Sequence, residues 1–159
     1  MKRTGINDEL IRVIRSQFAL DWDGFHGMPH WNRVRENGLC LAELTGAKQN
    51  VVELFAVLHD SRRLNDGSDP LHGDRAAVFA QTLAGSVFDL DAEDLELLMT
   101  ACRHHSGGFI VADITVLTCW DADRLDLGRI GMRPDPTLLG TGAARDPGMI
   151  QWAYERSLK

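Results

Sequence analysis

The 159-residue sequence has little cysteine, no net positive charge and no long apolar run. Its three cysteines, Cys40, Cys102 and Cys119, are widely spaced and form no C-x-x-C pair, so neither a disulfide framework nor a thiolate zinc site is expected. The formal net charge of -6 opposes the binding of duplex nucleic acid, which requires a strongly cationic face. A small anionic ligand remains compatible, because a local cluster of arginines is sufficient to bind it.

No apolar run approaches the roughly 20 residues that a membrane-spanning helix needs, so we expect no membrane partner. The first residues, "MKRTGIN", lead into charged helical sequence rather than the apolar core of a signal peptide, which favours a cytoplasmic protein. The chain also has no internal repeat and no linker long enough to divide it. Its length and 44% apolar composition therefore predict one domain over residues 1–159.

Apolar periodicity and helix-end signals predict an all-α fold of about six to eight helices. The segments expected to be helical are residues 7–20, 30–46, 50–65, 69–85, 91–108, 114–128 and 149–158. Asn50 and Glu53 stand in capping-box positions, which favours a buried helix over a strand at residues 51–58. A strand remains an alternative for residues 114–119, which are rich in β-branched side chains. The Gly- and Pro-rich residues 129–148 are expected to form a surface loop.

Every histidine of the chain lies in one of five short clusters of metal-binding residue types. These clusters are "HGMPH" (His26, His30), "HD" (His59, Asp60), "LHGDR" (His72), "RHHS" (His104, His105) and "WDADRLD" (Asp121, Asp123, Asp126). Imidazole and carboxylate groups together suit divalent Mn, Fe, Co, Ni or Zn, and helical bundles assemble such sites from several helices. Adjacent helical residues point about 100° apart, so His59 and Asp60 reach one ion only at a helix edge that faces a cleft.

The ordered pattern of His30, His59-Asp60 and Asp123 resembles the H…HD…D signature of the HD superfamily of metal-dependent phosphohydrolases. The resemblance covers about residues 24–131 and leaves residues 132–159 as a C-terminal loop and helix. It implies a compact all-helical HD domain that holds one divalent ion, or two, with these four residues as the primary ligands. Three further histidines match the positions that supply a second metal in two-metal relatives, or that support the first: His72, His104 and His105.

Two of these assignments stay open. The "ADRL" context selects Asp123 as the last ligand, but Asp121, two residues earlier, takes that role if the helix is rotated. His26 matches the first histidine of the H-x-x-x-H motif of many relatives, but Gly27 and Pro29 leave it on no fixed helix face. We therefore assign His26 to substrate binding rather than to the metal.

The chain departs from the family pattern directly after the HD pair. Many relatives continue with Ile-Gly-Lys or with an acidic residue one turn later, whereas Ser61, Arg62 and Arg63 follow here. Arg63 lies four residues after His59, on the same helix face, where a guanidinium can bind phosphate bidentately. Arg103 is a second substrate-binding candidate and Arg124 a lesser one. At least one of the two adjacent arginines, Arg62 and Arg63, is expected to belong to a solvated helix end. For Asp126 the alternative is a surface ion pair with Arg129 or Arg124.

The resemblance implies hydrolysis of a phosphoester, of a nucleotide or another small phosphorylated metabolite, by a metal-activated water. Asp60 and Asp123 are expected to orient this water, and Arg63 to neutralise charge on the phosphoryl oxygens. Two other functions remain open. An HD-fold diiron oxygenase is compatible with the extra histidines, and a non-catalytic metal-bound sensor needs only the ligand set. We expect a monomer or homodimer; the sequence specifies neither the metal nor the substrate.

Overall fold

The computed structural model describes residues 2–159, which form eight α-helices, two short 3-10 helices and no strand. This confirms the predicted all-α fold and its number of helices. The elements, in chain order, are α1 (Asp8–Gln17), α2 (Met28–Thr45), α3 (Gln49–Leu58), α4 (His72–Leu83), α5 (Ala92–His104), α6 (Ile114–Arg124), η1 (Leu127–Ile130), η2 (Pro136–Leu138), α7 (Gly142–Arg145) and α8 (Pro147–Ser157).

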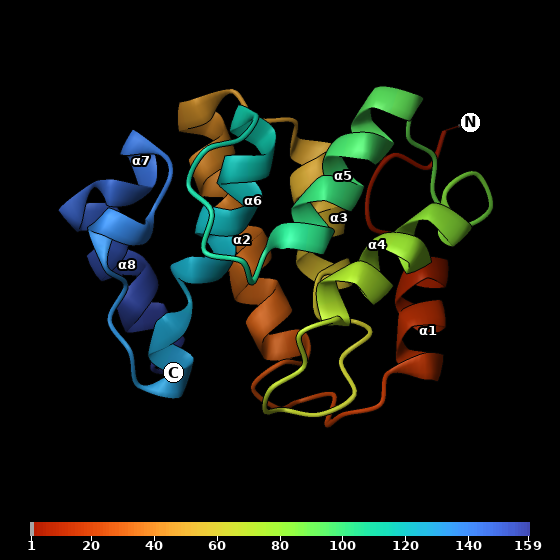
Figure 1. Ribbon diagram of the computed structural model, residues 1–159, viewed down its shortest axis with the longest axis horizontal. Helices are drawn as coiled ribbons and strands as arrows, with labels where there is room; N and C mark the ends of the chain where they lie inside the picture. The colour runs from red at the N-terminus through yellow and green to blue at the C-terminus, as the bar shows by residue number, and fades with distance from the viewer. Residues whose placement is uncertain (1) are drawn as a thin grey trace.

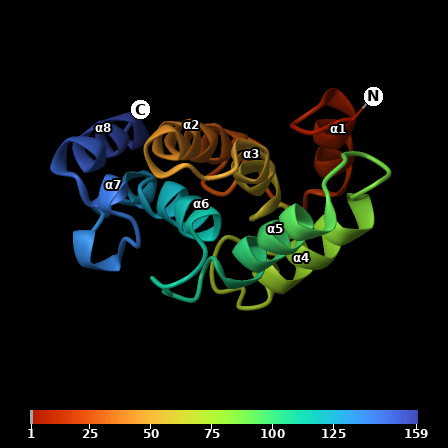
Figure 2. The ribbon, with the colours of Figure 1, turned by 90° about the horizontal axis from the view of Figure 1, so that it is seen from above.

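Three helices, α2, α3 and α6, pack against one another in the middle of the molecule (Figure 1). The pair α4 and α5 covers them on one side, and α7 and α8 pack against α2 on the other. The view from above shows α1 at the edge farthest from α7 and α8 (Figure 2). This arrangement brings the end of α3, the start of α2, the start of α4 and the ends of α5 and α6 to one region of the bundle.

Helix-end signals account for most of the helix boundaries. The side chains of Asn7, Asp91 and Asp113 accept hydrogen bonds from backbone N–H groups in the first turns of α1, α5 and α6. Gly46 ends α2 in the left-handed conformation, with φ of 79°. The helix at α6 shows that the strand alternative for residues 114–119 is wrong, because α6 is capped and buries its apolar side chains against three neighbouring helices.

The predicted capping box of α3 is also wrong. The helix begins at Gln49, so Asn50 is already inside its first turn. Asn50 donates to the carboxylate of Asp94 on α5, and Glu53 accepts two hydrogen bonds from Arg35 on α2. Both side chains therefore bind neighbouring helices, and the Oδ1 of Asn50 also accepts from the backbone N–H of Val51 at 2.9 Å.

The C-terminal segment contains more structure than the predicted surface loop. Within residues 129–148 the chain forms η2 and the short helix α7. Asp121 of α6 accepts hydrogen bonds from the backbone nitrogens of Gly140 and Thr141, at 2.9 and 2.8 Å, and so ties this segment to the bundle. No helix in the part of the chain that the structure describes is long and apolar enough to cross a membrane.

The core surrounds α3, which buries side chains on almost every side. Val51, Val52, Leu54 and Phe55 have no exposed surface. Burial of such side chains contributes roughly 1.5 to 3 kcal/mol each to folding. The HD pair therefore stands at the end of the most rigidly enclosed helix of the molecule. The cysteines behave as small apolar residues, with Cys102 and Cys119 buried and Cys40 half-buried.

Candidate metal centre

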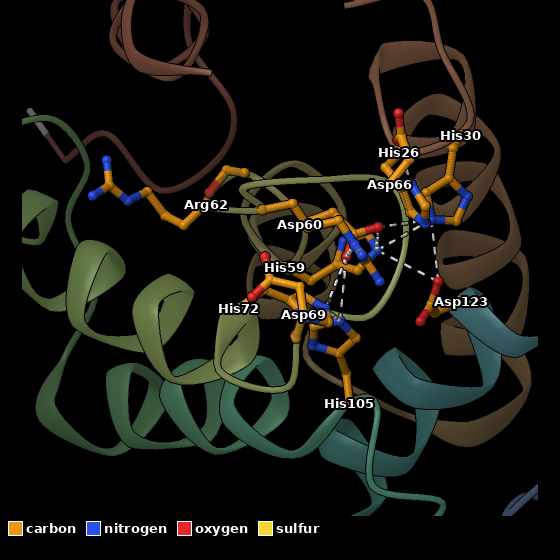
Figure 3. Close-up of polar contacts among 12 residues, drawn as sticks. His26, His30, His59, Asp60, Arg62, Asp66, Asp69, His72, His105 and Asp123 are labelled. Atoms are coloured by element: carbon orange, nitrogen blue, oxygen red, sulfur yellow. Dashed lines mark hydrogen bonds and ion pairs between the residues drawn. The ribbon is translucent and has the colours of Figure 1, made fainter. Parts of the chain in front are cut away.

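The HD pair follows directly on the last residue of α3 and is buried. His59 has an exposed fraction of 0% and Asp60 of 3%. The ring of His59 stacks on Phe55, and its Nδ1 donates to the backbone oxygens of Phe55 and Ala56, at 3.0 and 3.1 Å. These contacts fix the ring so that its Nε2 points toward α2 and α6. The close-up shows this nitrogen within a group of converging polar side chains (Figure 3).

The first group of converging donors joins α2, the end of α3 and α6. His30 Nε2 lies 3.2 Å from both His59 Nε2 and Asp123 Oδ1, and 3.4 Å from Asp60 Oδ2. His59 Nε2 lies 3.3 Å from Asp60 Oδ2 and 3.4 Å from Asp123 Oδ1. Donors that bind one ion at about 2.1 Å are separated by about 3.0 to 3.4 Å at octahedral or tetrahedral angles. The first group therefore has the spacing of a metal-ligand set.

A second group shares Asp60 with the first. The other carboxylate oxygen, Oδ1, lies 3.3 Å from the Nε2 atoms of both His72 and His105. These two nitrogens are 2.8 Å apart. His72 begins α4, and His105 directly follows α5. The two oxygens of one carboxylate thus face two separate pairs of histidines, as Figure 3 shows.

The far nitrogen of each of the four rings faces an oxygen acceptor. Nδ1 of His30 lies 2.6 Å from Asp126 Oδ2, and the other Nδ1 atoms face the backbone oxygens of Phe55 and Ala56, Asp69 and Cys102. Since a carbonyl oxygen cannot donate, each Nδ1 carries the hydrogen and each neutral ring directs a lone pair from Nε2. The Nε2 atoms and the carboxylate oxygens are 2.8 to 3.4 Å from one another. At these separations the nitrogen lone pairs and the oxygens repel one another unless a positive charge lies between them. The residues therefore fit a divalent cation.

The pKa values of these groups reflect the same demand for positive charge. Burial disfavours the charged form of His59, but the carboxylates of Asp60 and Asp123 outweigh that cost and raise its pKa to about 10. The pKa of His30 is raised too, because hydrogen bonds to carboxylates offset its burial. Burial alone would raise the pKa values of the two aspartates, yet the facing histidines hold both well below the usual range. The cluster therefore attracts either protons or a metal ion.

Asp126 supports the first group and is the residue that sequence reasoning misjudged most. The expectation that it pairs with arginines at the surface is wrong, since its exposed fraction is 0%. Its Oδ1 accepts from Arg33 Nε at 2.7 Å, while Oδ2 faces His30, and Arg129 lies 3.9 Å away. A carboxylate in this position fixes the tautomer and orientation of a metal-binding histidine. Asp126 follows Asp123 by three residues, a spacing that places two side chains on the same helix face, and this spacing was the sequence signal that could have placed Asp126 near the centre.

The structure brings Asp123, and not Asp121, to the cluster. Residues two apart on a helix point about 200° apart, so only one of the two can face the histidines. Asp121 points toward the C-terminal segment, where it holds Gly140 and Thr141, and its burial raises its pKa. Asp121 is therefore a structural residue here.

The expectation that both histidines of the "HH" pair support the centre is not met. His105 joins the second group, whereas His104 is exposed and lies edge-on against Phe109, with ring centroids 5.8 Å apart. The physical reason is the rotation of about 100° between consecutive residues at the end of α5. Only the residue that continues the inward face can reach Asp60.

Two of the predicted substrate-binding arginines lie beside a pocket next to the second group. The pocket has a volume of about 450 Å³, and its lining includes Arg63, His72, Arg103 and His104. Arg63 Nε lies 3.4 Å from Asp60 Oδ1, and Arg103 pairs with Asp74 at 3.6 Å. Cationic groups therefore stand where this pocket meets the histidines.

The remaining candidates do not line this pocket. His26 Nδ1 lies 2.8 Å from Asp66 Oδ1, and burial lowers the pKa of His26 although Asp66 opposes the shift. Arg62 bonds to Gln17 and extends away from the cluster, as Figure 3 shows. Arg124 donates to the backbone oxygen of Leu138. Trp31 and Trp120, which adjoin ligand residues in the sequence, are buried in the core.

A comparison with solved structures supports the reading of the ligand pattern. The chain is similar to a predicted HD superfamily hydrolase from an uncultured Thermotogales bacterium, with 25% sequence identity and a TM-score of 0.69. The match covers 92% of this chain and 84% of that one. No protein-family model and no curated protein matches the chain. The chain therefore has the fold of the HD superfamily, which confirms the predicted resemblance, and its His/Asp cluster is compatible with a hydrolase of that superfamily.

Proposed function

We propose that the protein is a metal-dependent phosphohydrolase that cleaves a phosphoester of a nucleotide or another small phosphorylated metabolite. The observation that supports this most strongly is the convergence of four imidazole Nε2 atoms on the two oxygens of Asp60. Each ring is turned inward by an acceptor at its Nδ1. Such a donor set suits a divalent transition metal better than any role in packing.

His30, His59, Asp60 and Asp123 would hold the ion, and His72 and His105 with Asp60 offer a second position. A bound divalent ion supplies Lewis acidity, which lowers the pKa of a water ligand to near neutrality and polarises a phosphoryl oxygen.

The two aspartates of the first group have different tasks in this proposal. Asp60 is enclosed by four histidines and has a side-chain exposure of 4%, so it fixes the ligands in place. Asp123 has a side-chain exposure of 16% and is the ligand carboxylate nearer to solvent. It is therefore the better placed of the two to orient the attacking water.

Arg63 and Arg103 would bind the phosphate group of the substrate. Both line the pocket beside His72. Arg103 can form two parallel hydrogen bonds to phosphate oxygens, whereas Arg63, whose Nε and Nη1 bind Asp60 and backbone oxygens, offers its charge and its Nη2. A pocket of about 450 Å³ falls in the range of small-molecule sites, which supports a metabolite or nucleotide as substrate. The net charge of -6 opposes duplex nucleic acid as substrate.

The test combines metal analysis with a panel of phosphoesters. Protein purified without chelator should contain Mn, Fe, Co, Ni or Zn and release phosphate anaerobically from at least one of p-nitrophenyl phosphate, sugar phosphates and nucleoside monophosphates. Asp60→Ala should lose metal and hydrolysis, whereas Asp74→Ala, which changes an exposed carboxylate, should keep both. An Asp60→Ala variant with full metal content and full activity would refute the proposal.

The same samples separate the two alternative functions. Two irons per chain with O₂ consumption and no phosphate release would identify a diiron oxygenase. Retained metal with neither reaction on the whole panel would favour a non-catalytic sensor. Measuring phosphate release under anaerobic conditions keeps the two chemistries apart, because oxygenation cannot then contribute.

A further inference from the structure

The oxygen of Asp60 that faces the second histidine pair also faces an arginine. Oδ1 lies 3.3 Å from His72 Nε2 and from His105 Nε2, and 3.4 Å from Arg63 Nε. A guanidinium remains charged at every pH at which a protein stays folded. The Asp60 oxygen that faces the second histidine pair is thus in contact with a permanent positive charge. The arginines nearest to the first group, Arg33 and Arg129, pair instead with Asp126 behind His30.

The guanidinium of Arg63 is held in this place. Its Nη1 donates to the backbone oxygens of Asn65 and Gly67, at 3.3 and 3.1 Å. Its backbone N–H donates to the oxygen of Asp60 at 3.2 Å, and its side-chain exposure is only 14%. The two hydrogen bonds of Nη1 therefore oppose a movement of the charge away from Asp60, and the backbone hydrogen bond fixes the turn that carries Arg63.

The second group is also poorer in negative charge than the first. The first group has two carboxylates, Asp60 and Asp123. A third, Asp126, lies on the far side of His30, where it is paired with Arg33 at 2.7 Å and with Arg129 at 3.9 Å. In the described part of the chain the second group has only its share of Asp60. The Nδ1 atoms of its histidines face neutral backbone oxygens, and the nearby carboxylate of Asp69 is bound to Arg75. Less negative charge means weaker attraction for a divalent cation.

We infer that Arg63 makes the two metal positions unequal, so that the protein holds one ion tightly in the first group and a second only weakly at Asp60, His72 and His105. The inference rests on the proposed metal centre. Arg63 repels the second ion and competes with it for Asp60 Oδ1. Because the same guanidinium lines the adjacent pocket, Arg63 stands beside the substrate phosphate as the positive group that a second ion would otherwise supply.

The experiment measures metal affinity rather than activity. Metal-stripped protein is titrated with Mn²⁺ by calorimetry, and ion content is counted after dialysis against submicromolar Mn²⁺. The wild type should retain one ion, and Arg63→Gln should bind the second ion roughly tenfold to a hundredfold more tightly. Arg63→Lys keeps the charge and should behave like the wild type. Arg103→Gln removes an arginine of the same pocket that pairs with Asp74 instead, and should not change the second affinity.

A second pair of measurements guards against a folding defect in Arg63→Gln. The affinity for the first ion should stay within a few-fold of the wild type in this variant, and its Mn²⁺ spectrum by electron paramagnetic resonance should show a coupled pair. His72→Ala, made in the wild-type background, should keep the tight ion.

The possible failures are distinguishable. Two ions of equal affinity in the wild type, an Arg63→Gln variant identical to it, or loss of the tight ion in His72→Ala would overturn the inference and leave the metal centre standing. Protein that binds no ion in any variant would overturn the proposed centre as well.

Discussion

Asp126 Oδ2 lies 2.6 Å from Nδ1 of His30, while Asp123, three residues earlier, has its Oδ1 3.2 Å from Nε2 of the same ring. One short stretch at the end of α6 thus contacts His30 at both of its nitrogens. The outer carboxylate makes the ring a stronger electron donor and keeps it from rotating. In the proposed metal centre, Asp126 would therefore contribute to metal binding without touching the ion.

Asp126→Asn should weaken binding of the tightly held ion by roughly tenfold to a hundredfold, because a neutral amide polarises the ring of His30 less than a carboxylate does. Competition with a chromogenic chelator measures the affinity directly. Asp121→Asn is the matched control, since it changes a buried aspartate of the same helix that binds Gly140 and Thr141 instead. The control should lower the melting temperature without changing the affinity. Equal affinities in the two variants would contradict the role given to Asp126.

Metal-stripped protein should lose stability as the pH rises. The pKa of His59 is about 10 in the folded protein and 6.5 in the unfolded chain, so its protonation stabilises the fold fully below pH 6.5 and progressively less between pH 6.5 and about 10. Thermal melts across this window test the trend. The Tm of metal-loaded protein should fall less steeply with rising pH, since the ion replaces the protons. The difference in Tm between metal-loaded and metal-stripped protein should therefore grow with pH. A flat profile for the metal-stripped protein would be inconsistent with the charge balance described for the cluster.

Arg103→Gln should raise KM for the phosphoester substrate about threefold to tenfold and leave the metal content unchanged. The ion pair of Arg103 with Asp74 is long, at 3.6 Å, and solvent-exposed, so it holds the guanidinium only weakly and leaves it free to meet a phosphate. Steady-state kinetics with the best substrate of the panel give the ratio of the two KM values, that of the variant to that of the wild type. Arg133→Gln, which removes an exposed arginine bonded to Gln151, serves as the control and should have wild-type kinetics. An unchanged KM in Arg103→Gln would remove this residue from the substrate pocket.

Gly73 allows the close approach of α4 to α5 that brings His72 and His105 together. A Cβ added at this position would lie 2.6 Å from the backbone oxygen of Cys102 and 2.7 Å from that of Arg103. Gly73→Ala should therefore cost about 1 to 3 kcal/mol of folding free energy and lower Tm by roughly 2 to 12 °C. Gly142→Ala, where the nearest atom is 3.9 Å away, should be nearly neutral. A Gly73→Ala variant as stable as the wild type would show that the two helices can separate without cost.

The predictable part of this protein is local. Asn7, Asp91 and Asp113 begin helices because a side-chain oxygen can satisfy free N–H groups within three residues, and the periodicity of apolar side chains identifies the helices between them. The pattern of His30, His59-Asp60 and Asp123 likewise needs only order and spacing along the chain to suggest the superfamily. Where the helix begins earlier than the cap pattern implies, as at α3, which already contains Asn50 in its first turn, the local signal fails.

Tertiary structure decided what depends on the rotation and approach of whole helices. The sequence by itself determined the longer helices and the set of metal-binding residue types, but not the short elements η2 and α7. It favoured Asp123 over Asp121 only through the resemblance to the ADRL context, and it could not choose between His104 and His105, because a small rotation of a helix exchanges neighbours about 100° or 200° apart. Only packing turned Asp126 inward to His30 and set Arg63 beside Asp60. The first of these contacts joins segments far apart in the sequence, and the second depends on the turn that follows α3. Hydrophobic periodicity predicts neither.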